Sequence, residues 1–98
     1  MRASTSLVRH FCDTLLSGYG VETTYYDPLA SGEAVGALMR PNTTVVYVES
    51  PGSLTFEMQD IPAIAGAAHQ RGALVVMDNT WATPLYFKPL AHGVDLSI

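Results

Sequence analysis

The chain has 98 residues, of which 48% are hydrophobic and 14% are charged, and its formal net charge is −4. This length and apolar content fit one small globular domain and exclude a disordered chain, while the few basic residues argue against a nucleic-acid partner. No apolar run approaches the ~20 residues of a membrane span, so we expect no membrane partner. Cys12 is the only cysteine, which excludes an internal disulfide and fits a cytoplasmic location.

The first half of the chain predicts two helices and two strands. Apolar residues at helical spacing predict a helix over 5–17, which is followed by glycines that stop it. β-Branched and aromatic residues predict a strand over 21–26, closed by an Asp-Pro turn. The segment 31–40 predicts a short helix, and 43–50 predicts a strand that ends at a Pro-Gly pair.

The second half predicts one well-capped helix between strands. Asp60 is a predicted N-cap for a helix over 61–71, which has a proline in its first turn and a glycine after its last residue. The segment 73–78 is too short for a helix and nearly continuous in apolar residues, which predicts a strand covered on both faces. After Pro84 we expect irregular chain, and 94–98 predicts another strand.

This order of elements predicts the fold class. Strands that alternate with helices indicate an α/β domain with three layers and a mostly parallel sheet, joined by right-handed crossovers. The last strand pattern, 94–98, stops with no loop or helix after it. An apolar strand at a terminus would expose an edge that invites pairing, so we expect the chain to be part of a longer protein.

Asp78 ends an apolar strand pattern, and ligands of parallel sheets bind at the carboxyl ends of the strands. Three interpretations stay open from the residues alone: an Asp78-Asn79-Thr80 turn, a magnesium ligand, or a carboxylate that holds a buried cation. The chain has no glycine-rich phosphate loop, which excludes an NTPase type of magnesium site. A phosphoacceptor site would need more acidic residues at an earlier strand end, where only Asp27 occurs.

Two long segments resemble the cystathionine β-lyase branch of the pyridoxal-phosphate-dependent transsulfuration enzymes. They are VVYVESPGSLTFEMQDIPAIA (45–65) and ALVVMDNTWATPLYFKPLAHGVDLSI (73–98). The stretch FCDTLLSGYGVETTYYDPL (11–29) also matches, so the resemblance covers about residues 11–98. The form DNTW, in place of the DNTF of many γ-synthases and γ-lyases, favours the β-lyase branch.

The resemblance implies a fold, a cofactor and a reaction. The fold is the aspartate-aminotransferase-like fold type I, and the cofactor is pyridoxal 5′-phosphate (PLP). The implied lyase cleaves the small-molecule substrate cystathionine to homocysteine, pyruvate and ammonia in methionine biosynthesis, and the whole protein is expected to be a homo-oligomer. The nearest alternative is γ-synthase or γ-lyase chemistry on the same scaffold, and another is a non-catalytic α/β remnant.

The same resemblance assigns cofactor-binding residues. Asp78 matches the carboxylate that holds the protonated pyridine nitrogen of PLP, and that proton strengthens the ring as an electron sink. Ser53 matches a position near the phenolic oxygen of the cofactor and the substrate, with an ordinary turn residue as the alternative. Asn79 and Thr80 brace Asp78 or simply cap the turn, and Trp81 is expected to line the pocket wall.

The chain also departs from the family pattern. The Schiff-base lysine of the family belongs to a segment after Ile98, and Lys88, the only lysine, does not match it. Thr5 stands at the position of the ring-stacking tyrosine, and residues 1–10 depart from the family. We therefore expect 1–98 to be a partial PLP-binding large domain, truncated at both ends, with no catalytic residue and no activity as an isolated chain. The three histidines lack metal-ligand spacing, so no metal site is expected.

Overall fold

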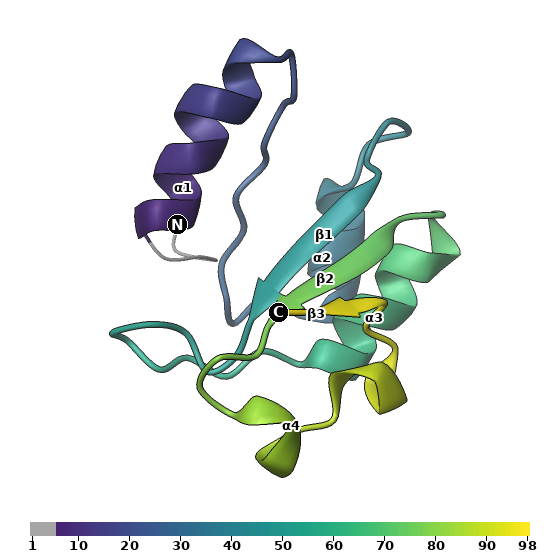
Figure 1. Ribbon diagram of the computed structural model, residues 1–98. Coiled ribbons are helices and arrows are strands. Elements are labelled where there is room, and N and C mark those ends of the chain that lie inside the picture. The colour runs from purple at the N-terminus through teal and green to yellow at the C-terminus, as the bar shows by residue number, and fades with distance from the viewer. Residues whose placement is uncertain (1–5) are drawn as a thin grey trace.

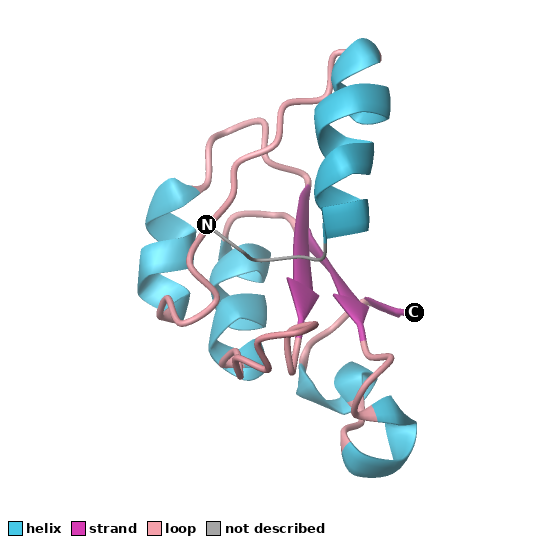
Figure 2. Cartoon of the chain, turned by 90° about the vertical axis from the view of Figure 1, so that its left-hand side faces the viewer, coloured by secondary structure: helices cyan, strands magenta, loops and turns pink. Residues whose placement is uncertain are grey.

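The computed structural model describes residues 6–98, which form a small parallel sheet with helices on both sides (Figures 1 and 2). The strands are β1 (Val45–Glu49), β2 (Leu74–Asp78) and β3 (Leu96–Ser97), in that order across the sheet. Both pairings are parallel, and the register of β1 on β2 runs from Val45 opposite Leu74 to Glu49 opposite Asp78. The predicted α/β fold with a parallel sheet is confirmed.

Six helical segments lie within the described residues, and two of them begin at a capping side chain. In chain order they are α1 (Ser6–Phe11), η1 (Cys12–Leu16), α2 (Gly32–Leu38), α3 (Ile61–Gln70), α4 (Thr83–Tyr86) and η2 (Pro89–His92). The Ser31 side chain accepts the N–H of Ala34 and the Asp60 side chain accepts that of Ala63, which fixes the starts of α2 and α3. The helix predicted over 5–17 is present from Ser6 as α1 and its continuation η1, whereas Thr5 lies outside the described residues.

One face of the sheet carries the hydrophobic core. Val48, Val75 and Met77 are buried in the same cluster as Ile64 and Ala68 of α3. Figure 2 shows α2 and α3 together on this side of the sheet. Because apolar burial is the main favourable contribution to folding, this face holds the domain together.

The opposite face of the sheet is open. Val45 is 50% exposed and Leu74 is 57% exposed, although α1 lies on this side. A groove of about 740 Å³ separates α1 and η1 from the sheet, and its lining includes Phe11, Tyr47 and Ile98. The prediction that β2 is covered on both faces is therefore wrong for the described residues, because α1 stands away from the sheet.

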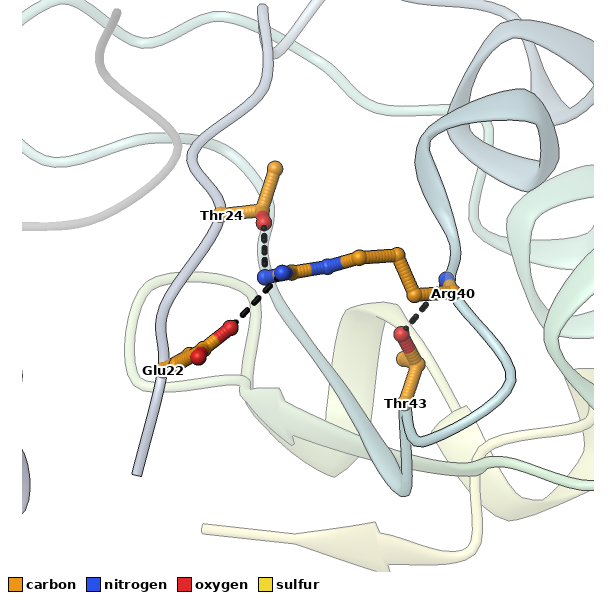
Figure 3. Close-up of polar contacts among 4 residues, drawn as sticks. All are labelled: Glu22, Thr24, Arg40 and Thr43. Atoms are coloured by element: carbon orange, nitrogen blue, oxygen red, sulfur yellow. Dashed lines mark hydrogen bonds and ion pairs between the residues drawn. The ribbon is translucent and has the colours of Figure 1, made fainter. Parts of the chain in front are cut away.

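The segment 21–26 is extended but forms no strand in the described part of the chain, so the predicted strand is wrong. Side chains hold the segment instead. Arg40 donates to Glu22 at 2.6 Å and to Thr24 at 3.3 Å (Figure 3), and the Tyr26 hydroxyl donates to a backbone carbonyl of β1. Strand propensity describes a local preference, whereas a strand also needs an edge with which its backbone pairs.

The prediction of irregular chain after Pro84 is wrong, because α4 and η2 form in this part of the chain. Pro84 and Pro89 both lie in first helical turns, where a missing N–H costs nothing, and Gly93 ends η2 with a φ of 93°. The strand predicted over 94–98 is confirmed only for Leu96–Ser97, although hydrogen bonds to β2 continue on both sides of these two residues.

Candidate functional site

The carboxyl ends of β1 and β2 lie side by side, because Glu49 and Asp78 are register partners. The loops that follow the two strands leave from this edge and meet. The rings of Phe56 and Trp81, one from each loop, pack edge-to-face with their centroids 5.1 Å apart. The structure thus brings the Asp78 turn and the loop that carries Ser53 to the same edge of the sheet, where parallel sheets bind ligands.

Asp78 is half-buried, and its two carboxylate oxygens have different hydrogen-bond partners. Its Oδ1 accepts the backbone N–H of Thr80 at 3.0 Å and the Thr80 hydroxyl at 2.5 Å. This is an Asx turn, one of the three interpretations open from the residues alone. The Oδ2 atom has a 3.5 Å contact from the Tyr47 hydroxyl, which is long for a hydrogen bond, so this oxygen keeps capacity for a stronger donor.

Tyr47 shares a face of the sheet with Asp78 and Glu49, and sequence reasoning missed it. Burial raises the pKa of Tyr47 above its ordinary value, and the neighbouring charges of Asp78 and Glu49 raise it further. The phenol therefore stays protonated and acts as a donor toward Asp78. The available signal was the period of two along β1, which places Tyr47 and Glu49 on one face.

Ser53 lies in a tight loop directly after β1. Its backbone N–H donates to Oε1 of the buried Glu49 at 3.2 Å. The N–H of Gly52 donates to the carbonyl of Glu57 at 2.9 Å, and the N–H of Phe56 donates back to Gly52 at 2.9 Å. The Ser53 hydroxyl has no hydrogen-bond partner within residues 6–98, so the loop fixes its backbone and leaves the hydroxyl available.

Asn79 is held through both its backbone and its side chain. It is only 2% exposed, its backbone N–H donates to the carbonyl of Ile98 at 2.8 Å, and its side-chain N–H donates to that of Phe87 at 3.2 Å. These bonds join the Asp78 turn to the end of β3 and to the chain after α4. The interpretation of Asn79 as a brace for Asp78 stays a prediction with this geometry in its favour.

The remaining candidates make no contact with Asp78 that the structure shows within residues 6–98. Lys88 is exposed between α4 and η2, where its backbone carbonyl accepts the N–H of Ala91. Among the residues that the structure describes, no group of three or more His, Cys, Asp or Glu side chains is placed to hold a metal ion. None of the helices seen between residues 6 and 98 is long and apolar enough to cross a membrane.

Comparisons with known proteins place the chain among PLP-dependent enzymes. The sequence pattern of the family described as Cys/Met metabolism PLP-dependent enzyme matches residues 6–98. A Rhizobium johnstonii protein, provisionally named as a cystathionine beta-lyase, is 62% identical over 90 residues, which are 92% of this chain and 22% of that protein. Cystathionine beta-lyase MetC of Escherichia coli is 46% identical over 90 residues, which are 90% of this chain and 22% of that protein.

The structural comparison agrees with the sequence comparison. The crystal structure of cystathionine gamma-lyase from Lactobacillus plantarum complexed with L-serine matches with a TM-score of 0.85 and 34% identity, over 91% of this chain and 23% of that one. The chain thus has the fold of part of a fold type I PLP enzyme, and it spans about 22% of the length of the curated relatives named above. Because the family pattern covers nearly the whole chain, the chain belongs to the Cys/Met metabolism PLP-dependent enzyme family.

Proposed function

We propose that residues 1–98 are part of the PLP-binding large domain of a carbon–sulfur lyase that cleaves cystathionine to homocysteine, pyruvate and ammonia. The observation that carries this proposal is the placement of Asp78 at the carboxyl end of a parallel strand, with Oδ1 fixed by Thr80 and Oδ2 available. The cystathionine beta-lyase names of two relatives support the choice of substrate.

The residues at this edge fit the cofactor. A carboxylate that is held through one oxygen and open at the other is suited to accept the N–H of a pyridinium ring, and Asp78 meets this description. The free hydroxyl of Ser53, on the neighbouring loop, is suited to donate to the phenolic oxygen of the same ring. The aromatic pair Phe56 and Trp81 supplies apolar surface beside them.

Each residue has a distinct part in the proposed mechanism. Bound PLP supplies an electron sink for the carbanion at the α-carbon of the substrate. Asp78 would hold the pyridine nitrogen of PLP in its protonated form, because a nearby negative charge raises the pKa of that nitrogen. Thr80 limits rotation of the Asp78 carboxylate through its two hydrogen bonds, and Ser53 would help to orient the ring through its hydroxyl.

The remaining parts of the proposal concern the whole protein. Lys88, the only lysine, is exposed and does not match the Schiff-base position of the family, so the isolated 98-residue chain is proposed to release no pyruvate from cystathionine. The whole protein is proposed to be a cytoplasmic homo-oligomer that takes a small amino-acid substrate. The net charge of −4 supports the absence of a nucleic-acid partner.

A hybrid enzyme tests the proposal. Residues 6–98 replace the matching segment of E. coli cystathionine beta-lyase, and the hybrid is expected to bind PLP and to release pyruvate from cystathionine. Asp78→Ala in this hybrid is expected to lower kcat by about 10²–10³-fold, the scale for removal of a preorganised electrostatic partner. Asp60→Ala is the control, because it removes the N-cap of α3 and leaves the strand ends intact. A hybrid that binds no PLP, or near-normal turnover in Asp78→Ala, would sink the assignment.

A γ-lyase or γ-synthase reaction is the second candidate, favoured by the match to the L. plantarum structure. A second hybrid places the same residues in that γ-lyase. If the parent is a β-lyase, the segment should retain a larger fraction of the host activity in the E. coli enzyme than in the γ-lyase. The opposite order would favour the second candidate.

A further inference from the structure

A buried amide closes the base of the loop that carries Ser53. Gln59 is 7% exposed, and its Oε1 accepts the backbone N–H of Glu49 at 3.0 Å. The backbone N–H of Gln59 donates to the Ser50 hydroxyl at 3.0 Å. Two hydrogen bonds therefore join the start of the loop to its end.

The other end of the amide is also held. Its Nε2 donates to the Tyr26 hydroxyl at 3.0 Å, and that hydroxyl donates to the backbone carbonyl of Tyr47 at 3.1 Å. Burial raises the pKa of Tyr26 to about 12, so the phenol keeps the proton that it donates. The extended segment that contains Tyr26 thus supports Gln59 from beside β1.

The network continues to Ser53 through Glu49. Gln59 fixes the backbone of Glu49, and the Glu49 carboxylate accepts the backbone N–H of Ser53. Between these anchors, Leu54 and Phe56 have positive φ values of 69° and 59°. Non-glycine residues keep this costly conformation only where the surrounding structure enforces it. The loop is therefore under strain, and the bonds at its base oppose its relaxation.

We propose that Gln59 is a positioning residue of the cofactor site, which holds the Ser53 hydroxyl at the edge beside Asp78 by fixing both ends of the loop. The proposal rests on the proposed function of Ser53 and Asp78. An apolar residue of similar size would fill the same volume, but it would remove the Oε1 acceptor of the Glu49 N–H and the Nε2 donor to the Tyr26 hydroxyl, which would keep only its bond to the Tyr47 carbonyl. Loss of such hydrogen bonds is costly in a buried site.

The test uses the E. coli hybrid and two measurements made without substrate: the dissociation constant of PLP and the hydrogen exchange rates of the amides in 50–58. Gln59→Leu is expected to raise the dissociation constant about tenfold, which corresponds to about 1.4 kcal/mol, and to speed exchange at Ser53. Gln70→Leu makes the same substitution at the exposed end of α3, and it is expected to change neither the dissociation constant nor the exchange rates. Val75→Ala removes core volume from β2 and controls for lost stability alone.

A conservative variant separates positioning from packing. Gln59→Glu keeps an oxygen that accepts the Glu49 N–H but replaces the Nε2 donor, so it is expected to recover part of the PLP affinity that Gln59→Leu loses. The proposal is overturned if Gln59→Leu behaves like Val75→Ala in both measurements, or if exchange at Ser53 quickens while PLP affinity is unchanged. A parent hybrid that binds no PLP refutes the proposed function, whereas slow exchange at Ser53 in that hybrid would still show that the loop is anchored as described.

Discussion

The Nε2 atom of His69 lies 2.8 Å from Oδ2 of Asp95, and the same carboxylate oxygen accepts the backbone N–H of Val75 at 2.8 Å. The Asp95 side chain, in the turn before β3, therefore joins that turn to the end of α3 and to the start of β2. The hydrogen bond from His69 holds the pKa of Asp95 below its ordinary value, and the bond from Val75 lowers it further.

Asp95 is therefore expected to make the stability of the chain dependent on pH in the acid range. An acid with a depressed folded-state pKa stabilises the fold fully above its unfolded pKa, about 3.9, and the stabilisation is lost as pH falls through the lower folded-state pKa. Asp95→Asn should lower the melting temperature near pH 6 and flatten its decline below about pH 4. Thermal unfolding by circular dichroism between pH 2.5 and pH 7 measures both effects.

The control for this prediction is Asp60→Asn. Asparagine also caps helices, so this variant removes a carboxylate and keeps the cap of α3. Asp60→Asn should leave the decline of the melting temperature below about pH 4 unchanged. An unchanged decline in Asp95→Asn would show that the His69 contact contributes nothing to the pH dependence.

The two faces of the sheet should differ sharply in their sensitivity to truncation. Ile64 is fully buried against the face of the sheet that carries the hydrophobic core, which we call the inner face. Leu74 is largely exposed on the opposite, outer face. Ile64→Ala is expected to lower the free energy of unfolding by about 2–5 kcal/mol, and Leu74→Ala by less than about 1 kcal/mol. Urea denaturation of the isolated chain measures both. Equal losses would mean that the outer face is covered in solution.

Local signals explain which elements the sequence predicts well. The start of α3 depends on Asp60 and the N–H three residues later, so its cap is visible within one turn of sequence. The segment 21–26 has strand-like residues but lacks a pairing edge, and that edge depends on distant chain. The helices α4 and η2 had a local signal, since Pro84 and Pro89 lie in their first turns, but the irregular spacing of the apolar residues around them obscured it.

The same distinction applies to the candidate site. The position of Asp78 at a strand end follows from the pattern of its own strand and from the rule for parallel sheets. The contacts of Tyr47 with Asp78 and of Gln59 with Tyr26 join residues that are 31 and 33 positions apart. No local pattern predicts such pairs, because they arise from the packing of one element on another.

Thr80 should affect the activity of the hybrid enzyme because its hydroxyl holds the Asp78 carboxylate in place. Thr80→Val in the E. coli hybrid removes the hydroxyl that donates to Oδ1 and keeps the backbone N–H that donates to the same atom. One lost hydrogen bond to a charged group contributes about 1.5–3 kcal/mol at most, so kcat/KM is expected to fall about 10-fold, well short of the loss in Asp78→Ala. Thr80→Ser keeps the donor and should retain most of the activity. Equal activity in Thr80→Val and the parent hybrid would contradict this role.

Arg40 should hold the segment 21–26 locally while adding little to global stability. Its ion pair with Glu22 is exposed, with side-chain exposures of 50% and 66%, and such pairs typically contribute less than about 1 kcal/mol. Arg40→Ala is therefore expected to change the urea midpoint slightly but to speed amide exchange across 21–26, and high salt should mimic part of this effect.

Arg40→Lys should be intermediate, because an ammonium group cannot reproduce the planar fork that contacts Glu22 and Thr24 together (Figure 3). Arg71→Ala, at the end of α3, is the matched control. Unchanged exchange in Arg40→Ala would mean that the tyrosines of the segment hold it without help from the arginine.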